Sequence, residues 1–398
     1  METATQLPLQ GIRVVEFSHM IMGPTCGMIL ADLGADVIKV EPLKGDNTRR
    51  MPGMGSGFYN ACNRNKKSLA VDLEKSEGKE LVMRLISQAD VVCENFKPGK
   101  MKRVGLDYKS LSEMYPELIY VSLKGFLPGP YENRTALDEV VQMMGGLAYM
   151  TGPPGRPLRA GASVNDIMGG TFGALGVIAA LHERTQSGRG QEVQSALFEN
   201  CVFLCATHMA DFYGSGIPPN PMPARKHCWG VYDTFETADG EQVFLAVVSD
   251  AQWRSLCMAF DLNKYVDDER LTSNGLRVIA REWLIPEIRN LLIKYDSQNL
   301  YEIFERHELS YAPIVRPDQL FDDKHLIESG GLAPLTIEQG KEMPVPLLPL
   351  TLGGRRLQPR MPIAEIGENT SEILQQLGYT ESDISIMSQN GAILDPEE

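Results

Sequence analysis

Long hydrophobic runs are missing from this 398-residue sequence, and so is any regular pattern of cysteines. No apolar stretch approaches the roughly 18 residues that a membrane-spanning helix needs. Residues 1–10 lack the basic and apolar segments of a secretory leader, and the seven cysteines have irregular spacings. We therefore expect a soluble, cytoplasmic protein that has no disulfides and binds no membrane.

Positive charge is also scarce, because 52 acidic residues outnumber 38 lysines and arginines. The formal net charge of −14 argues against a nucleic-acid partner, which normally requires a basic face. Local basic clusters nevertheless occur near residues 49–50, 64–67 and 97–103. Two interpretations stay open: these clusters are solvated surface, or they line a pocket for one polyanionic small molecule.

The motifs of metal- and nucleotide-dependent enzymes are absent too. The stretch SHMIMGPTCG after the first predicted strand lacks G-x-G-x-x-G, and no Walker A, H-E-x-x-H or G-x-S-x-G motif occurs. The six histidines have no metal-site spacing. Cys201 and Cys205 lie four residues apart without a second ligand pair, which favours buried thiols over zinc. We predict no metal site and no permanently bound cofactor.

Alternating strand and helix patterns are what the first 126 residues do contain. Helical patterns separate apolar runs that predict strands at 11–17, 35–41, 67–73, 89–96 and 117–126. This alternation predicts an α/β domain with a mostly parallel sheet and right-handed crossovers. Ligands of such sheets bind beyond the carboxyl ends of the strands, here in loops that start near Ser18, Pro42, Asn95 and Lys124.

After residue 136 the strand–helix alternation gives way to a different pattern. Helical patterns at 137–148, 166–184 and 197–213 lead into a segment rich in glycine and proline. A hairpin on Asp239-Gly240 and several helices then predict a smaller α+β domain. We divide the chain into a large domain (1–213), a linker (214–226), a small domain (227–330) and a C-terminal segment (331–398) that returns to the large domain.

Asp166 is the only acidic side chain between residues 159 and 177, and an apolar, glycine-rich run follows it. An ionised carboxylate at such a place is costly to desolvate unless something holds it. One interpretation makes Asp166 the N-cap of a helix. The other makes it a nucleophile, kept ionised by the helix N-terminus without a cationic partner. The glycines at 169, 170, 173 and 176 fit a narrow ligand slot, tight helix packing, or both at once.

The chain resembles the class III CoA-transferases, the family of formyl-CoA transferase and carnitine CoA-transferase. The resemblance starts with LPLQGIRVVEFSHMIMGPTCGMILADLGADVIKVEPLKGDNTR and continues through NRNKKSLAVDL, ADVVCENFKPG, LIYVSLKGF, ASVNDIMGG, SGRGQEV and LQQLGYTESDI. It implies a Rossmann-like large domain, a small domain and an interlocked homodimer. It also implies that the enzyme moves CoA between an acyl-CoA and a small carboxylic acid through an aspartyl anhydride and an aspartyl-CoA thioester.

The resemblance assigns Asp166 as the catalytic nucleophile. It places CoA contacts at Ile21, Met22, Val71, Asp72, Asn95, Phe96, Lys97, Arg103 and, near the thiol end, Asp138. Formyl-CoA transferase has an arginine where this chain has Pro42, so we expect a phosphate contact to shift to Lys39, Arg49 or Lys67. Backbone N–H groups of Gly145 and Gly146, or of Gly169 and Gly170, are candidate donors to the anionic intermediates.

Two other functions are weighed against CoA transfer. A 2-methylacyl-CoA racemase of the same fold needs a histidine where this chain has Leu137, and leucine cannot move a proton. A CoA-binding protein without turnover would use Asp166 only as a cap. The segments SHMIMGP and KGFLPGPY resemble most the family members that use succinyl-CoA as donor, with itaconate, glutarate or 3-sulfinopropionate as acceptor. The candidates to bind the second acidic group of such an acceptor are Arg159, Arg225, Lys226 and His227.

Overall fold

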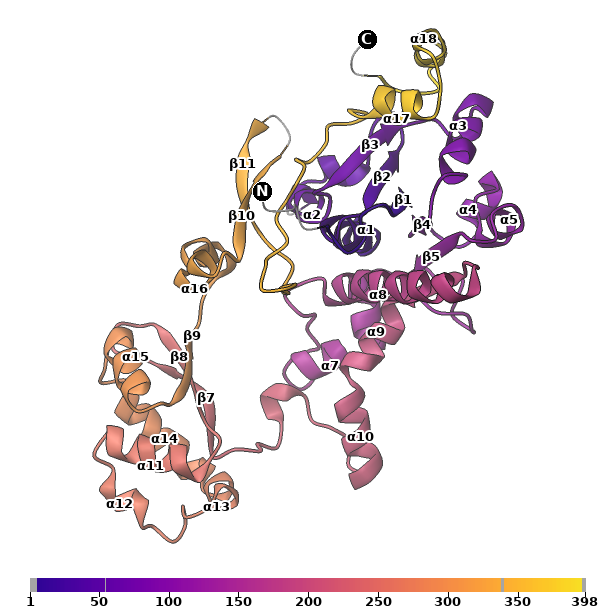
Figure 1. The fold of residues 1–398 in the computed structure, drawn as a ribbon. Coiled ribbons are helices and arrows are strands. Elements are labelled where there is room, and N and C mark those ends of the chain that lie inside the picture. The colour runs from indigo at the N-terminus through magenta and orange to yellow at the C-terminus, as the bar shows by residue number, and fades with distance from the viewer. Residues whose placement is uncertain (1–5, 54, 338–339, 396–398) are drawn as a thin grey trace. The chain divides into compact units, whose positions relative to one another are not determined.

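A six-stranded parallel β-sheet forms the centre of the first compact unit of the protein (Figure 1). The computed structural model describes residues 6–53, 55–337 and 340–395. The sheet has the order β3-β2-β1-β4-β5-β6, the order of doubly wound nucleotide-binding folds. Its strands are β1 (Arg13–Phe17), β2 (Asp36–Glu41), β3 (Lys66–Ala70), β4 (Val91–Glu94), β5 (Ile119–Lys124) and β6 (Glu192–Ala196). The predicted α/β fold with a parallel sheet is confirmed.

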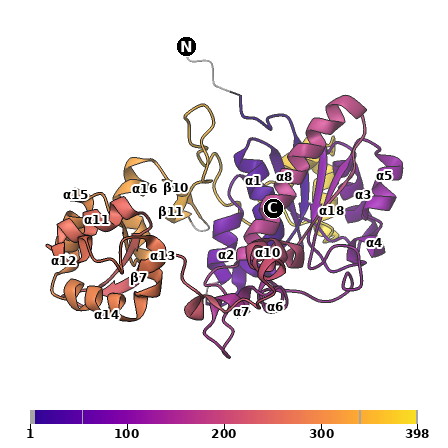
Figure 2. The ribbon, with the colours of Figure 1, turned by 90° about the horizontal axis from the view of Figure 1, so that it is seen from below.

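Helices cover both faces of this sheet (Figure 2). The helices that precede residue 224 are α1 (Met22–Asp32), α2 (Gly55–Cys62), α3 (Ser76–Ile86), α4 (Lys100–Val104), α5 (Tyr108–Met114), α6 (Asp138–Met144), α7 (Leu147–Thr151), α8 (Val164–Ser187), α9 (Leu197–Leu204) and α10 (Ala206–Ser215), with short 3-10 helices η1 (Asn47–Arg50) and η2 (Met222–Ala224). Because strand residues alternate between two buried faces, the four inner strands β1, β2, β4 and β5 are rich in apolar residues.

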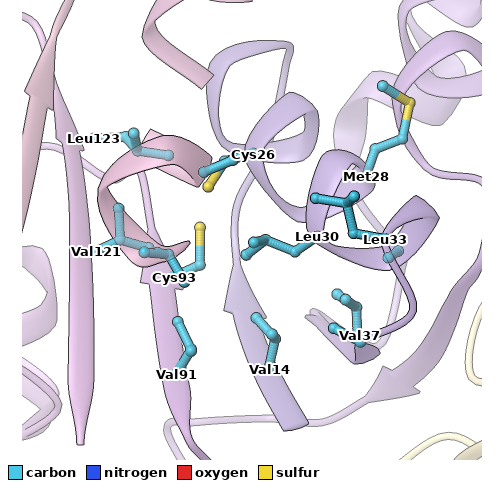
Figure 3. Packing of buried hydrophobic residues seen from close by; sticks show 14 of the residues in the cluster. Val14, Cys26, Met28, Leu30, Leu33, Val37, Val91, Cys93, Val121 and Leu123 are labelled. Atoms are coloured by element: carbon cyan, nitrogen blue, oxygen red, sulfur yellow. The ribbon is translucent and has the colours of Figure 1, made fainter. Parts of the chain in front are cut away.

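Each face of the sheet has its own hydrophobic cluster. On one face, α1 and α8 pack on alternate strand residues such as Val14, Val91 and Val121 (Figure 3). On the other, residues from α3, α4 and α5 pack on the intervening ones, among them Val15 and Val92. The sheet is therefore fixed from both sides, which holds the loops at its carboxyl ends in place.

The glycines of α8 are a packing surface. A Cβ atom at Gly170 would lie 2.6 Å from the Met22 carbonyl oxygen, and one at Gly173 would lie 2.7 Å from Leu123 Cδ2. These distances are too short for an added carbon, so α8 can contact α1 and β5 this closely only without those side chains. The tight-packing interpretation of these glycines is therefore the right one, and the proposed ligand slot on this face is wrong.

Several predicted helices divide at glycine or irregular backbone. The pattern at 137–148 forms α6 and α7, separated by Gly145 and the left-handed Gly146 (φ 89°). The pattern at 197–213 forms α9 and α10, separated at Cys205. The sequence analysis missed β6, which follows the turn at 187–190, because its EVQSA sequence lacks a buried apolar run. Helix α2 begins at Gly55.

The first compact unit comprises residues 1–223 and 324–398, so the C-terminal residues belong to the same unit as the parallel sheet. They form α16 (Lys324–Glu328), an antiparallel pair β10 (Leu332–Thr336) and β11 (Glu342–Pro346), then α17 (Thr370–Gln376) and α18 (Glu381–Gln389). The Ser68 amide donates to Asn369 Oδ1 at 3.0 Å, and the Asp72 amide donates to the Ala392 carbonyl at 2.8 Å. The chain end thus supports β3 and the loop that follows it.

The second compact unit comprises residues 224–323. Its antiparallel sheet has the order β7-β8-β9, built from β7 (Val231–Glu236), β8 (Gln242–Val247) and β9 (Ser310–Pro313). Its helices are α11 (Asp250–Ala259), α12 (Asn263–Val266), α13 (Asn274–Ile279), α14 (Arg281–Leu292) and α15 (Ser297–Arg306), with the 3-10 helix η3 (Pro317–Asp322). The predicted hairpin on Asp239-Gly240 joins β7 and β8, and Gly240 has the positive φ (79°) that such a turn favours.

Helix α8 is long and apolar enough to cross a membrane by length and composition alone. It also packs on α1, β5 and β6, and its residues 169, 170, 173, 174 and 177 are buried in the core. The sequence analysis found no such run because Asp166 and polar residues interrupt the apolar pattern. These contacts identify α8 as the core helix of the sheet, while a cytoplasmic location stays a prediction.

Candidate active site

Strands β1 and β4 are neighbours at the point where the strand order reverses, so their following loops form the crevice of the sheet. The Asn95 side chain holds these two loops together. Its Oδ1 accepts from the His19 amide at 3.0 Å, and its Nδ2 donates to the His19 carbonyl at 2.8 Å. The His19 ring stacks on Phe96 with a centroid distance of 5.5 Å. The predicted CoA contact Asn95 therefore has a second task, which is to shape the crevice.

A cavity of about 700 Å³ opens at the carboxyl ends of β1, β2 and β3. Four of the predicted CoA contacts line it: Val71, Asp72, Phe96 and Arg103. The rest of its wall comes from β1 and β2, from the segment 42–47, from Leu73 and Glu74, and from α4. A cavity of this size is in the range of small-molecule and cofactor sites.

Three cations lie around this cavity: Lys44, Lys100 and Arg103. The ammonium of Lys100 lies 3.6 Å from the centre of the Phe96 ring. Burial, with a smaller contribution from the nearby Arg103 charge, lowers the pKa of Lys100. A bound polyanion would supply the negative charge that these groups lack, so the cluster at 97–103 fits the ligand interpretation better than a purely solvated surface.

The three cations proposed to replace the missing arginine at position 42 are engaged elsewhere. Lys39 is buried, and its Nζ lies 3.2 Å from Asp46 Oδ2. Arg49 is buried in a two-point ion pair with Glu41, at 2.7 and 3.0 Å. Lys67 pairs with Glu372 at 2.9 Å. Removing a buried charge from its partner is costly, so Lys39 and Arg49 are poorly suited to bind a phosphate. The partner of Lys67 is half exposed, so a phosphate contact of Lys67 stays a prediction.

Asp166 lies in the first turn of α8 but is not its N-cap, because the helix begins at Val164 and Ser163 holds the cap position. The carboxylate of Asp138 takes the capping role instead. Its Oδ2 accepts from the amides of Asn165 at 2.7 Å and Asp166 at 3.1 Å. Among the described residues, no hydrogen bond or ion pair to the Asp166 carboxylate is seen. The side chain that the cap interpretation needed is therefore unengaged.

The Asp166 carboxyl has the properties of a nucleophile that works near neutral pH. Burial, and then the nearby Asp138 carboxylate, raise its pKa to about 7, while the Arg159 charge acts in the opposite direction. A raised pKa means a more basic carboxylate, which is a better nucleophile once ionised. Asp166 is only partly buried, so the residue is not sealed from solvent.

Asp138 is the centre of a buried hydrogen-bond chain. The Gln142 side chain donates to Asp138 Oδ1 through Nε2 and accepts from the Ala160 amide through Oε1 at 2.8 Å. Both side chains are buried. The chain fixes α6, the segment at 160 and the first turn of α8 relative to one another. Gln142 was not predicted as a site residue. Its spacing of four residues from Asp138 on a predicted helix could have indicated the contact between the two side chains.

Other predicted site residues lie in different surroundings. Ile21 and Met22 are buried at the start of α1, and a Cβ at Gly169 would collide with the Met22 methyl group, so these two residues can offer a ligand mainly their backbone. Lys97 lines a separate cavity of about 330 Å³ beside β5. Gly169 and Gly170 lie inside α8, and the Gly145 amide donates to the Val141 carbonyl at 2.8 Å. Helical hydrogen bonds thus engage the amides of Gly145, Gly169 and Gly170, and Gly146 stays a candidate donor.

The comparison with known proteins assigns this site to a family. Residues 9–370 match the sequence model of CoA-transferase family III. The chain belongs to that family. It is a CoA-transferase whose substrates are CoA thioesters and carboxylic acids. The two alternatives, a racemase and a CoA-binding protein without turnover, are therefore set aside.

Two relatives and one solved structure illustrate how closely this family III enzyme matches others. It is 35% identical to the succinate–glutarate CoA-transferase of Agrobacterium fabrum, over 93% of this chain and 96% of that protein. It is 34% identical to the succinyl-CoA:mesaconate CoA-transferase of Haloarcula hispanica, over 80% and 83% of the two chains. The crystal structure of a CAIB/BAIF family protein from Brucella suis superposes with a TM-score of 0.84 at 32% identity, covering 94% of this chain and all of that one.

Proposed function

We propose that this family III enzyme transfers CoA from succinyl-CoA to a short dicarboxylic acid, with Asp166 as the nucleophile. The observation that carries the proposal is the Asp166 carboxyl, which is partly buried, has a pKa of about 7 and lacks an ion-pair partner among the described residues. The relatives named for succinate, glutarate and mesaconate supply the substrate class.

In the proposed cycle the ionised Asp166 attacks the thioester carbonyl of the donor. The carbon–sulfur bond breaks, CoA leaves as a thiolate, and an aspartyl acyl anhydride remains. The thiolate then attacks the aspartyl carbonyl, which releases the donor acid and leaves CoA on Asp166 as a thioester. The acceptor carboxylate repeats these steps in reverse. Over the whole cycle one CoA thioester is broken and another is formed, so the overall exchange is close to energetically neutral and needs no ATP.

The nucleotide end of CoA is assigned to the cavity of about 700 Å³. Arg103, Lys100 and Lys44 offer charge-assisted hydrogen bonds to its phosphates, and Phe96, Val71 and Asp72 form part of the wall. Asp166 does not line this cavity, so the pantetheine arm has to follow the β1–α1 loop, whose Met22 packs on α8 one turn from Asp166. Asp138 then lies at the thiol end as a positioning residue.

The enzyme is also proposed to act as a homodimer. Large apolar side chains are exposed on one group of helices: Ile167, Phe172, Leu175 and Ile178 of α8, Phe203 of α9, and Met209, Phe212 and Tyr213 of α10. Contiguous exposed apolar area of this kind usually marks an interface. The resemblance noted above supports an interlocked arrangement of two copies, which would cover these helices.

The nucleophile is tested by intact-protein mass spectrometry after incubation with succinyl-CoA. We expect the wild type to gain the mass of CoA less one water, mapped by peptide analysis to Asp166, and Asp166→Ala to gain nothing while still binding CoA in calorimetry. Glu183→Ala, an exposed change on the same helix, is the matched control and should form the adduct. An adduct at another residue, or turnover by Asp166→Ala, would refute the assignment.

A further inference from the structure

The segment that carries Arg159 is fixed next to the nucleophile by buried side chains. The Ala160 amide donates to Gln142, Gln142 donates to Asp138, and Asp138 accepts from the amide of Asp166 itself. Gln142 and Asp138 are both buried. The backbone at 159–160 therefore cannot move away from the first turn of α8 without breaking this chain of hydrogen bonds.

The Arg159 guanidinium is available to a ligand. One third of its side chain is exposed (33%), and its nearest carboxylate, on the exposed Glu139, is 3.8 Å away. Its Nε donates to the carbonyl of Ala160 at 3.0 Å, which orients the group and leaves its terminal nitrogens as donors. The Arg159 charge also lowers the pKa of Asp166, as expected of a cation close to that carboxyl.

Arg159 is distinguished from the other cations considered for the acceptor. Arg225, Lys226 and His227 belong to the compact unit 224–323, whereas Arg159 belongs to the same unit as Asp166. His227 is also engaged, because its Nε2 lies 3.2 Å from the Nη2 of Arg281. Arg159 is thus the candidate whose position relative to the nucleophile the structure defines.

We propose that Arg159 binds the second carboxylate of the dicarboxylic substrate and so selects dicarboxylic over monocarboxylic acids. This inference rests on the proposed function. A guanidinium offers two parallel N–H groups that match a carboxylate, while a carboxylic acid with a methyl group in place of its second carboxylate gains nothing from it. The weak contact with Glu139 is easily exchanged for such a bidentate partner.

The test compares matched acceptors with one donor. Initial rates of CoA transfer from succinyl-CoA are measured for two pairs of acceptors, glutarate with pentanoate and itaconate with 2-methylenebutanoate. In each pair a methyl group replaces one carboxylate. The enzymes compared are the wild type, Arg159→Gln and Arg159→Lys. Assays run at about pH 9, where a carboxyl of pKa about 7 is ionised with or without the arginine, so that a shifted pKa does not enter the comparison. Arg156→Gln, an exposed arginine three residues earlier, removes the same charge as a matched control.

We expect Arg159→Gln to lower kcat/KM for the dicarboxylic acids by about tenfold to a hundredfold, the range for a lost hydrogen bond to a charged group, and to leave the monocarboxylic acids unchanged. Arg159→Lys should recover part of the loss, and Arg156→Gln should change neither class. Equal losses for both classes, or no loss for either, would overturn the role of Arg159. If the wild type itself transfers CoA to none of these acids, the proposed function fails instead, and the two failures are thereby distinguished.

Discussion

At the scale of single residues, the proposed catalysis depends on the carboxyl group of Asp166, whose surroundings keep it uncharged up to near-neutral pH. Burial and the neighbouring Asp138 raise the pKa of Asp166 to about 7, and only its ionised form can attack a thioester. For an acid with a raised pKa, the active form is lost as pH falls through that value. We therefore expect kcat/KM for the acyl-CoA to rise with pH and level off above about 8, with a midpoint near 7.

The same shift predicts that Asp166 destabilises the fold. Because the pKa of Asp166 in the folded protein (about 7) exceeds its ordinary value of 3.8, the free energy of unfolding falls as pH rises between these two values. Asp166→Asn should therefore be more stable than the wild type at pH 8, by up to about 4 kcal/mol, and equally stable near pH 3. Urea unfolding at the two pH values measures this. A stabilisation that is the same at both would contradict the raised pKa.

At this scale the sequence was informative about chemistry and uninformative about partners. A lone aspartate ahead of an apolar helix could be singled out from the chain alone, but its role as cap or nucleophile stayed open. The structure shows that Ser163 holds the N-cap position and that the Asp166 amide donates to Asp138. The hydrogen-bond chain through Gln142 and Ala160 could not be predicted, because it joins segments 18 residues apart through tertiary packing. The ion pairs of Lys39 and Arg49 were hidden for the same reason.

At the scale of elements, the contact between α1 and α8 positions Asp166, the proposed nucleophile, and this contact depends on small residues. Gly170→Ala would place a carbon 2.6 Å from the Met22 carbonyl oxygen, and backbone cannot rotate away as a side chain can. We expect a loss of about 1–3 kcal/mol in the free energy of unfolding, reduced by up to about 1 kcal/mol from the higher helix propensity of alanine.

The control for Gly170→Ala is Gly57→Ala in α2, where an added Cβ meets nothing within 4 Å. That variant should be neutral or slightly stabilised, because only the propensity gain applies. Equal effects of the two substitutions in urea unfolding would show that α8 adjusts its position and that the close packing is unimportant.

Helix α4 gives the second prediction at this scale, because its residues face two cavities. Arg103 lines the larger cavity, whereas Lys102 lines the smaller one. Arg103→Gln should raise KM for succinyl-CoA by about tenfold, the effect of one lost charge-assisted hydrogen bond, and leave KM for the acceptor unchanged. Lys102→Gln should change neither. A larger effect of Lys102→Gln would place the nucleotide in the smaller cavity beside β5.

At the scale of the whole molecule, the exposed apolar helices α8 to α10 predict the oligomeric state. Light scattering after size exclusion should give twice the chain mass of 44.1 kDa. Phe203→Asp introduces a charge at an exposed apolar position (64%) of α9 and should shift the protein toward the single-chain mass. Ile386→Asp, at a comparably exposed position (54%) of α18, is the control and should leave the mass unchanged. A monomeric wild type would refute the homodimer.

The overall architecture was more predictable than its details. Strand patterns rich in apolar residues identified five of the six central strands, since a sheet covered on both faces leaves an apolar signal. The sixth strand, β6, lies at the edge and is only half buried, so its sequence carries little of that signal. The divisions within 137–151 and 197–215 depend on the backbone at Gly146 and Cys205, which helical periodicity does not reveal.

The last residues of the chain have a consequence for biosynthesis. Asp72, which lines the proposed nucleotide cavity, donates its amide to Ala392, and Val71 forms a bridge with Ile393. A ribosome must therefore synthesise the chain through residue 393 before this wall acquires its backbone partners. Nascent chains that stop short of residue 392 should be unable to retain CoA, and deletion of residues 392–395 should damage the proposed CoA cavity more than the distant Asp166.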